Sequence, residues 1–557
     1  MIVKMKHLDL ICLKAERETT LEKLRNLGAI HLNLAGVAGA EIAAADTEVI
    51  NAEKAVQLIL KARGKTPIED VNVHERAVAE VLAIHTDRST LAAERDRLEK
   101  LIRIYEPYGD FDPELARKVL SAGVELKEVL PPELPEMRLS KLQEKLARVN
   151  NRIRIDNDRL AGCDEHSILK KFPQLQERAE FARAKAIVEE HGEIAVISGW
   201  IPEKYLRRLD DVMNGGRDLF EMAKKPAWGI LVRDPDDAEI PPTLVEPPKC
   251  FKAMKALFNG LGIAPAYTEA DVSVPFMCYF ALFFAMLVGD GAYGSIFLAA
   301  TLYFRKRLPR SWFTLLSVFS SATVAWGILS NTWFGAQIPW CADWPTVKWL
   351  ADPSYHNMML LCFTIGVSHL MLARIWNGIC KLNDTTCVAE FGWAGVLLFM
   401  YLVTNSIVGI FSGIPNWGYW VFAISLVCVF GFTVKPSELK TRGAELGMLP
   451  LNIMSALGDI ISYVRLFAVG LASVKVAENF NSMATGLVAG DKAWYLKAGF
   501  ALVMVAILVV GHALNLAMAG LSILVHAVRL NTLEFSNHKG VSWAGYAFKA
   551  FKSTTNN

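Results

Sequence analysis

The sequence predicts a chain of two kinds of structure: α/β cytosolic lobes linked by an antiparallel helical hairpin, followed by an all-α membrane domain of eight transmembrane helices. Residues 1–270 carry dense charge and heptad-like spacing, whereas residues 273–533 are dominated by long apolar runs. With 557 residues, the chain is also too long for one compact domain. The net charge of +2 is a sum over these two regions of different composition, and it gives no indication of a nucleic-acid partner.

The first lobe is expected at about residues 1–70, within a cytosolic arm that extends to residue 272. Residues 7–13 alternate as a strand, residues 19–27 fit a helix that stops at Gly28, and residues 29–34 fit a second strand. The start of the chain leads directly into the first strand, without the apolar core of a signal peptide. We therefore expect the arm to remain in the cytosol.

A helical hairpin is expected at about 71–191. Its first helix covers about 76–106, and the proline- and glycine-rich stretch 106–135 separates it from the second. The second helix shows a/d heptad spacing at Leu139, Leu142, Leu146, Val149, Ile153 and Leu160. An antiparallel pair that projects into solvent is the simplest outcome, and an ordinary helical bundle is the alternative.

A second α/β lobe is expected at about 192–245. Residues 193–202 predict a strand and turn, residues 204–213 a short helix, and residues 228–232 another strand. Two proline pairs, at 241–242 and 247–248, then predict a stiff linker to the membrane domain.

No cofactor, metal or nucleotide site is expected on this chain. Gly64-Lys65-Thr66 resembles the end of a phosphate-binding loop, but Ile59 stands where the first glycine is needed and no strand precedes it. The nine cysteines include no C-x-x-C pair, so neither a zinc site nor a disulfide framework is indicated.

The membrane domain is expected at 273–535, with a cytosolic tail at 536–557. Its eight spans are placed at about 273–288, 290–305, 311–335, 356–381, 388–413, 417–434, 447–481 and 494–532. The run 273–304 is divided near Gly289-Asp290-Gly291 because only this count brings all the basic loops to the cytosolic side. These loops contain Arg305, Lys306, Arg307, Arg310, Lys435, Lys440, Arg442, Lys539, Lys549 and Lys552. Both termini are then cytoplasmic.

Two arginines, Arg465 and Arg529, lie within the last two spans. An arginine near the bilayer centre costs about 2.5–3.5 kcal/mol, and its guanidinium does not deprotonate. Each therefore needs water, an acceptor or an anionic partner. Arg529 lies nearer the end of its helix, where snorkelling to the surface is the alternative.

Further polar residues gather on the same two helices. At about 100° per residue, one arc of the final span contains His512, Asn515, Ser522, His526 and Arg529. A broader arc of the preceding span contains Asn452, Ser455, Asp459, Ser462 and Ser473, with Glu478 on another side. Polar stripes inside a membrane favour a hydrated ion path, and hydrogen bonding between helices is the alternative for the serines. Small residues such as Gly458, Ala468, Gly470 and Ala472 suit a neighbour that slides past.

Four stretches carry a resemblance to a known family. Gly458–Ala472, which reads Gly-Asp-Ile-Ile-Ser-Tyr-Val-Arg-Leu-Phe-Ala-Val-Gly-Leu-Ala, closely resembles the hallmark helix of the V/A-type ATPase subunit a, called subunit I in prokaryotes. His526–Leu530 resembles the family's second arginine motif, and Pro275–Gly294 resembles its first membrane motif. Gly199–Pro202 matches an element of its second soluble lobe.

The resemblance implies a stator subunit that conducts H⁺ or Na⁺ through half-channels to and from a proteolipid c-ring, without an ATP site of its own. It implies that Arg465 faces the ring carboxylates and that Arg529 supports it. The implied partners are the c-ring, peripheral-stalk E/G-type subunits, the central-stalk collar (C/d-type) subunit and membrane lipid. The candidate ion-translocation residues are Arg465, Arg529, Asp459, His526, Ser462, Ser455, Glu478 and Ser522.

Two positions depart from the family pattern. Eukaryotic members carry a histidine where Ser473 stands and an acidic residue where Ala519 stands, so the outer half-channel is expected to use His526, Glu478 or water alone. The chain is also shorter than most eukaryotic relatives, which favours a bacterial or archaeal cell membrane. A permanent pairing of Arg465 with an acid of the same chain would overturn the proposed role. A secondary ion transporter with a large cytosolic regulatory arm is the alternative function.

Overall fold

The computed structural model describes residues 2–34, 39–64, 77–122, 131, 134–214, 228–236, 239–339, 343–350, 353–435, 443–488 and 494–553. The chain divides into two compact units. The arm unit comprises Met5–Pro235 and Lys549–Asn557, and the membrane unit comprises Met1–Lys4 and Asp236–Phe548. Lys65 and Thr66 of the loop-like stretch, and Lys440 and Arg442 of a predicted cytosolic loop, lie outside the described residues.

The boundary between the units falls at Pro235, earlier in the chain than the expected end of the arm at residue 272. The reason is a set of backbone contacts inside the membrane unit. Thr243 forms a parallel bridge with Ala547, and Ala264 forms one with Ala544. The linker and the segment after the last helix therefore stabilise each other, and the linker folds with the membrane unit.

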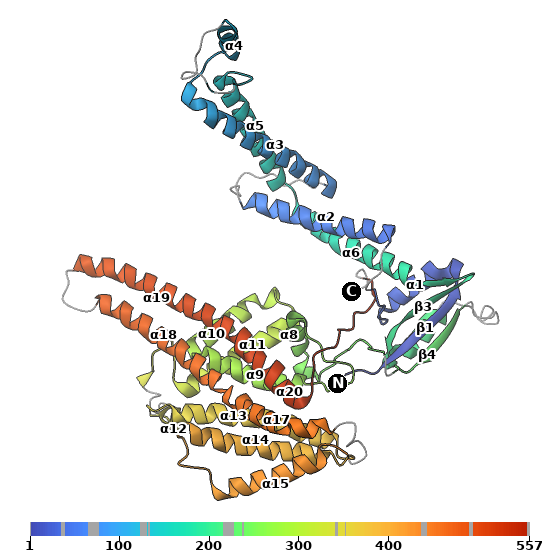
Figure 1. Cartoon of the computed structure of the whole chain (residues 1–557), viewed down its shortest axis with the longest axis vertical. Helices are drawn as coiled ribbons and strands as arrows, with labels where there is room; N and C mark the ends of the chain where they lie inside the picture. The colour runs from blue at the N-terminus through green and yellow to red at the C-terminus, as the bar shows by residue number, and fades with distance from the viewer. Residues whose placement is uncertain are drawn as a thin grey trace. The chain divides into compact units, whose positions relative to one another are not determined.

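The arm unit contains a four-stranded antiparallel sheet in the order β2-β3-β1-β4 (Figure 1). The strands are β1 (Met5–Leu13), β2 (Glu189–His191), β3 (Ile194–Pro202) and β4 (Trp228–Arg233). The two lobes expected from the sequence thus contribute strands to one sheet, because β1 is paired on one edge with β3 and on the other with β4. The strand expected at 29–34 is reduced to a bridge between His31 and Trp200.

One face of this sheet packs against α1 (Arg17–Leu27) and α7 (Leu206–Asn214). The alternation of β1 explains this core, since Leu8, Leu10 and Cys12 are buried on the same face. Gly199 permits the close approach of the segment around His31, because a Cβ at Gly199 would lie 2.8 Å from the His31 carbonyl oxygen.

The helical part of the arm unit contains four long helices and a short one. They are α2 (Ala40–Arg63), α3 (Val78–Tyr105), α5 (Leu139–Ala161), α6 (Glu165–Ile187) and the shorter α4 (Pro113–Ser121). The helices α3 and α5 pack against each other, and heptad residues of both form a common core. The structure adds α2, which pairs with α6. Its contact residues are mainly alanines, such as Ala52 and Ala55, and they give only a weak hydrophobic pattern in the sequence.

The membrane unit is built from helices. They are α8 (Met254–Leu261), α9 (Ser273–Val288), α10 (Gly291–Tyr303), α11 (Arg310–Ser330), α12 (Pro345–Leu350), α13 (His356–Cys380), α14 (Cys387–Ile407), α15 (Asn416–Phe432), α17 (Ala444–Ile461), α18 (Val464–Val488), α19 (Trp494–Ser522) and α20 (Ser536–Lys539). Two π-helical segments, η9 (Ile523–Ala527) and η10 (Leu530–Phe535), continue α19.

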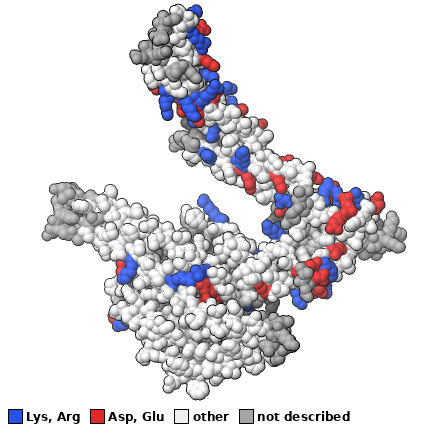
Figure 2. All heavy atoms as spheres, viewed as in Figure 1, with Lys and Arg blue, Asp and Glu red and all other residues white. Residues whose placement is uncertain are grey.

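Among the described residues, five helical stretches are long and apolar enough to cross a membrane. They are Arg310–Ser330, His356–Cys380, Cys387–Ile407, Leu446–Gly486 and Phe500–Lys539, and α9 and α15 are shorter apolar helices. On the face seen in Figure 2, charged side chains gather over the arm unit and are sparse over the membrane unit.

The expected break in the run 273–304 is confirmed. Gly289 ends α9 in the left-handed region, at a φ of 69°, which glycine adopts without strain. Asp290 then caps α10, with Oδ1 accepting a hydrogen bond from the Ala292 N–H at 2.8 Å.

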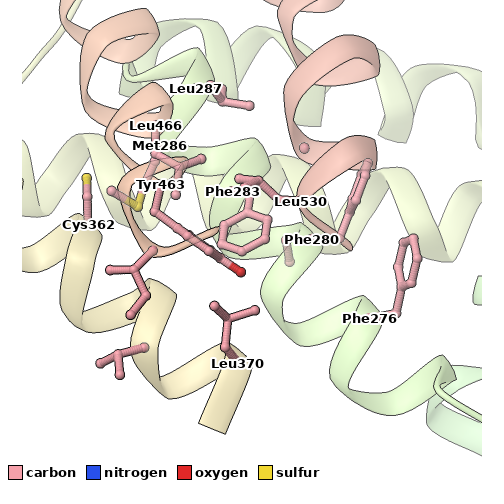
Figure 3. Close-up of a cluster of buried hydrophobic side chains, with 14 of the residues drawn as sticks. Phe276, Phe280, Phe283, Met286, Leu287, Cys362, Leu370, Tyr463, Leu466 and Leu530 are labelled. Carbon is pink, nitrogen blue, oxygen red and sulfur yellow. The ribbon is translucent and has the colours of Figure 1, made fainter. Parts of the chain in front are cut away.

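The core of the membrane unit surrounds α9 (Figure 3). Aromatic and aliphatic side chains of α9 meet the end of α17, the start of α18, α13 and η10. The residues labelled in this cluster are Phe276, Phe280, Phe283, Met286, Leu287, Cys362, Leu370, Tyr463, Leu466 and Leu530. The segments that carry the two arginines are therefore held by a shared apolar core.

Candidate ion-translocation site

Arg465 lies just after an interruption in the expected span 447–481. It is the second residue of α18, and the N–H groups of Arg465 and Leu466 donate to carbonyls three residues earlier, at 3.3 and 3.0 Å. This tighter bonding separates α17 from α18. The buried Tyr463 fixes the turn, since its hydroxyl forms a 2.9 Å hydrogen bond with Nδ1 of His369.

Arg465 has an acidic partner in its own chain. Its Nη2 donates to Oε1 of Glu534 at 2.9 Å, and Nε of Arg529 lies 3.5 Å from the same oxygen. The Glu534 side chain is 5% exposed, whereas the Arg465 side chain is 22% exposed. One carboxylate thus faces two permanent cations, which leaves a net charge of +1 in this group of three side chains. Among the described residues, Nη1 of Arg465 and Oε2 of Glu534 are buried without a hydrogen-bond partner.

Glu534 was missed in the sequence because it was assigned beyond the last span, which was expected to end at residue 532. In an α-helix, a residue five positions after Arg529 is rotated by about 140° and faces away from it. A π-helical turn, with its i→i+5 spacing, returns the fifth residue to the same side. The segment η10, Leu530–Phe535, therefore brings Glu534 toward Arg529 and Arg465.

Asp459 and Ser455 line a cavity of about 520 Å³, called here the Asp459 cavity. Its other lining residues include Arg374, Trp393, Thr433, Asn452 and His538. Oδ2 of Asp459 lies 3.0 Å from Nε2 of His538, and Nδ1 of His538 accepts a hydrogen bond from Nε of Arg374 at 3.1 Å. A histidine tautomer with its proton on Nε2 satisfies both contacts. Arg374 also donates to Glu390 at 3.2 Å, so the cavity wall is a connected set of ionisable groups.

Glu478 lines a second cavity of about 280 Å³, called here the Glu478 cavity. Lys475 lines it as well and donates to Oε2 of Glu478 at 2.7 Å. From there the lining continues along α18 through Val474, Gly470 and Leu466.

The two cavities lie on opposite sides of Arg465 along the α17–α18 segment. Asp459 precedes Arg465 by about 9 Å of helix, and Glu478 follows it by about 20 Å, at roughly 1.5 Å per residue. No described residue lines both cavities. The geometry is that of two separate polar spaces with a permanent cation between them.

The exposed side of α17 and α18 has small residues on both sides of Arg465. Gly458, Ala468 and Ala472 are exposed. Gly470 instead faces α9, where a Cβ would lie 2.6 Å from the Met286 carbonyl oxygen. The smooth surface expected from the sequence therefore covers only one face of the helix.

The remaining predicted site residues do not line either cavity. His526 lies in η9, half-buried, and its Nδ1 has no hydrogen-bond partner among the described residues. Ser522 ends α19, and Ser462 lies in the turn before Arg465, where its carbonyl oxygen accepts the Arg465 N–H.

A buried polar cluster joins α10, α18 and α19. Nδ2 of Asn515 donates to the Tyr293 hydroxyl at 3.1 Å and to the Ser473 carbonyl at 3.0 Å. The Tyr293 hydroxyl lies 2.7 Å from Nδ1 of His512. Because Oη of Tyr293 accepts from Asn515, its own proton is available for His512. Sequence periodicity placed His512 and Asn515 on one arc, but Tyr293, from a distant helix, was missed.

Similar proteins are found among curated sequences, whereas no family model matches the chain. The V-type ATP synthase subunit I 1 of Treponema pallidum (strain Nichols) is 27% identical over 99% of this chain and 100% of its own length. The V-type ATP synthase subunit I of Borreliella burgdorferi is 30% identical over 69% of this chain and 64% of its own length. The A-type ATP synthase subunit I of Methanocaldococcus jannaschii is 22% identical over 64% of this chain and 55% of its own length.

Proposed function

The chain belongs to the V-type and A-type ATP synthase subunit I family, and we propose that it conducts H⁺ or Na⁺ through two half-channels to and from a proteolipid c-ring. As a subunit I, it is a multi-pass membrane protein, a stator of a rotary ATPase, and it associates with other ATPase subunits. The names of these relatives do not favour the alternative of a secondary ion transporter. Ion flow would couple ring rotation to ATP hydrolysis or synthesis on other chains.

The observation that carries the half-channel proposal is the place of Arg465 between two separate cavities. Arg465 cannot lose its charge, so an ion cannot pass it directly from one cavity to the other. An ion entering either cavity would have to load onto a ring carboxylate and travel with the ring. Each elementary charge that crosses the membrane involves about 2.3 kcal/mol per 100 mV.

Glu534 refines the role of Arg465 in this proposal. A ring carboxylate that has its ion is neutral and can face lipid, and Arg465 favours the charged form when the carboxylate arrives. Because Glu534 is shared by two arginines, it holds Arg465 in place and neutralises only half of their combined charge. The remaining positive charge is available for one ring carboxylate at a time, so the internal pair is compatible with a transient external partner.

We assign the Asp459 cavity to the cytosolic half-channel and the Glu478 cavity to the outer one. The assignment rests on the basic loops, which by the positive-inside bias belong to the cytosolic side. It requires eight spans: α9, α10, α11, α13, α14, α15, α17 with α18, and α19 with η9 and η10. Both termini are then cytoplasmic, and the membrane is that of a bacterium or archaeon.

The ring would contact the exposed sides of α18 and α19, which run side by side (Figure 1). The exposed residues of α18 near Arg465 include Ala468 and Ala472, and α19 exposes apolar side chains, including Leu514 and Leu521, which are 51% and 65% exposed. Small and apolar side chains at this level suit close approach to a rotating helical surface in lipid.

The open face of the arm sheet supports the proposal of stalk partners. Ile11, Leu13 and Leu231 are 42%, 45% and 57% exposed on this face, and Leu13 is paired with the equally exposed Ile194. An apolar patch on a sheet face is typical of a docking surface. We assign it to the peripheral-stalk E/G-type subunits, and we place the central-stalk collar (C/d-type) subunit on the arm as well.

The assembly is tested by purifying the chain in mild detergent from the cells that produce it. We expect a proteolipid ring and soluble ATPase subunits to co-purify with it. A chain that purifies alone and still transports ions after reconstitution would contradict the stator proposal and would restore the transporter alternative.

A further inference from the structure

The membrane unit has a basic groove that the ion path does not use. It has a volume of about 910 Å³, and its wall includes Lys249, Lys252, Lys255, Asn259, Ser311 and Trp312. These residues come from two places in the chain: η5 (Lys249–Phe251) with α8, and the first turn of α11. The groove is distinct from both the Asp459 cavity and the Glu478 cavity.

The three lysines make this groove positive. They are exposed, and no ion pair joins any of them to an acidic side chain among the described residues. One acidic residue, Glu246, also lines the groove, so three lysines and one glutamate give the wall a net charge of +2. An anionic ligand would therefore meet lysine ammonium groups that are not already paired with an acidic side chain among the described residues.

The wall that carries these lysines is fixed by packing. On the opposite side of α8, Met254 and Phe258 are buried in the main core, and the Phe258 ring meets the Phe276 ring edge-on at 5.1 Å between centroids. The wall formed by the first turn of α11 is also fixed by packing. A Cβ on Gly260 would lie 3.4 Å from the Trp312 ring, so the end of α8 packs directly against this indole.

The groove also lies where a membrane surface is expected. Trp312 is in the first turn of α11, one of the five stretches long and apolar enough to span a bilayer. Tryptophans at the ends of spans occupy the headgroup region. The loop before α11 contains Arg305 and Arg307, both exposed, and adds to the positive charge at this end of the helix.

We propose that this groove binds the phosphodiester headgroup of an anionic phospholipid, with its acyl chains in the bilayer beside α11. Basic pockets on the cytosolic side of membrane helices recognise anionic headgroups by charge and hydrogen bonding. Three lysines and the Asn259 and Ser311 side chains supply the donors, and the Trp312 ring supplies an apolar surface at the level of the headgroup.

The test measures lipid retention by native mass spectrometry of the full chain in detergent. The probes are phosphatidylglycerol and phosphatidylcholine with identical acyl chains. The native chain should retain more phosphatidylglycerol, and the variant Lys249→Gln/Lys252→Gln/Lys255→Gln should lower that retention about fivefold or more, to the level of phosphatidylcholine. A matched variant of exposed arm lysines, Lys100→Gln/Lys118→Gln/Lys141→Gln, changes the net charge equally and should leave retention unchanged.

Three results would overturn the proposal. If the groove variant retained as much phosphatidylglycerol as the native chain does, the three lysines would not bind the lipid. If the groove and arm variants lost equal amounts of bound phosphatidylglycerol, the retention would depend on overall net charge and not on the groove. Glycerol phosphate, which has the charge but no acyl chain, should not displace the lipid at equal concentration, and efficient displacement would identify a site for soluble anions instead.

Discussion

At the residue scale, the central feature is the sharing of one buried carboxylate by two arginines. Removing one partner of a buried ion pair is expensive, because the other charge is left without compensation. Glu534 lies within 2.9 Å of Arg465 and 3.5 Å of Arg529, so its loss would leave two neighbouring cations. The positive charge presented to a ring carboxylate would then rise from one unit to two.

We therefore expect Glu534→Gln to slow coupled ion transport about tenfold, because the ring carboxylate would be held too strongly in its charged form. Initial rates of ATP-driven ion uptake into reconstituted vesicles measure this effect. Asp343→Asn is a suitable control, since Asp343 is an exposed carboxylate that pairs with Lys348 at 3.1 Å, away from the site. Unchanged transport in Glu534→Gln would mean that this carboxylate does not set the charge near Arg465.

A second prediction at this scale compares the half-buried Asp459 with the buried Ser473. Asp459→Asn should slow transport from the cytosolic side more than Ser473→Ala does, because Asp459 is ionisable and lines a cavity, whereas Ser473 lines neither cavity. The Ser473 hydroxyl is instead bonded to Asn515 at 3.1 Å, in the cluster that joins α18 to α19. Transport assays with both membrane orientations separate the two sides. Equal rates in the two variants would remove Asp459 from the path.

At the element scale, the parts that could be predicted are those with a local pattern. The a/d spacing of Leu142 and Val149 predicted the α3–α5 pair, and Gly289-Asp290-Gly291 predicted the break between α9 and α10. The features that could not be predicted depend on residues that are far apart in the chain or on irregular helical turns. The single sheet requires β1 to lie between strands more than 170 residues away, and no local pattern specifies such pairing. Glu534 depends on π-helical turns that regular periodicity does not foresee.

The C-terminal segment allows a prediction of pH dependence in the arm unit. The Lys549 N–H donates to Nδ1 of His31 at 3.0 Å, and the Phe551 N–H donates to the Ile30 carbonyl at 2.7 Å. Burial lowers the pKa of His31 and outweighs the hydrogen bond to the Lys549 backbone, which raises it, while the charge of Lys549 lowers it further. The stabilising contribution is therefore complete above the ordinary pKa of His31, about 6.5, and is lost as the pH falls toward the lowered value, because burial disfavours the protonated imidazole and its Nδ1 no longer accepts from the Lys549 N–H.

Hydrogen exchange measures this effect through the protection factor of the Phe551 amide, corrected for intrinsic exchange at each pH. Loss of a hydrogen bond worth about 1 kcal/mol predicts a decrease of roughly fivefold between pH 7 and pH 5. His31→Gln should make protection independent of pH over this range. His85→Gln is the control, since the pKa of His85 on α3 is also lowered by burial but this residue lies in a different helix. The same pH dependence in His31→Gln would exclude His31 as its cause.

At the scale of the whole molecule, the chain combines a charged arm with a membrane unit in which several ionisable residues are grouped. Asp459 and His538 line the Asp459 cavity, and Lys475 and Glu478 line the Glu478 cavity. Glu534 pairs with Arg465 and lies near Arg529. Ionisable residues inside a membrane are costly unless they have partners or water. Their grouping around two cavities and one shared carboxylate is the physical basis for assigning this chain the ion path of the rotary ATPase.

The most direct test of this account is ion transport by the complete ATPase with Arg465→Ala. Assembly and ATP binding on other subunits should be preserved, while ATP-driven accumulation of H⁺ or Na⁺ in reconstituted vesicles should be abolished. Arg305→Ala, which removes an exposed arginine from the loop before α11, should transport at the normal rate. Vesicles that still accumulate the ion with Arg465→Ala would show that this arginine does not separate the half-channels, and the account would be wrong.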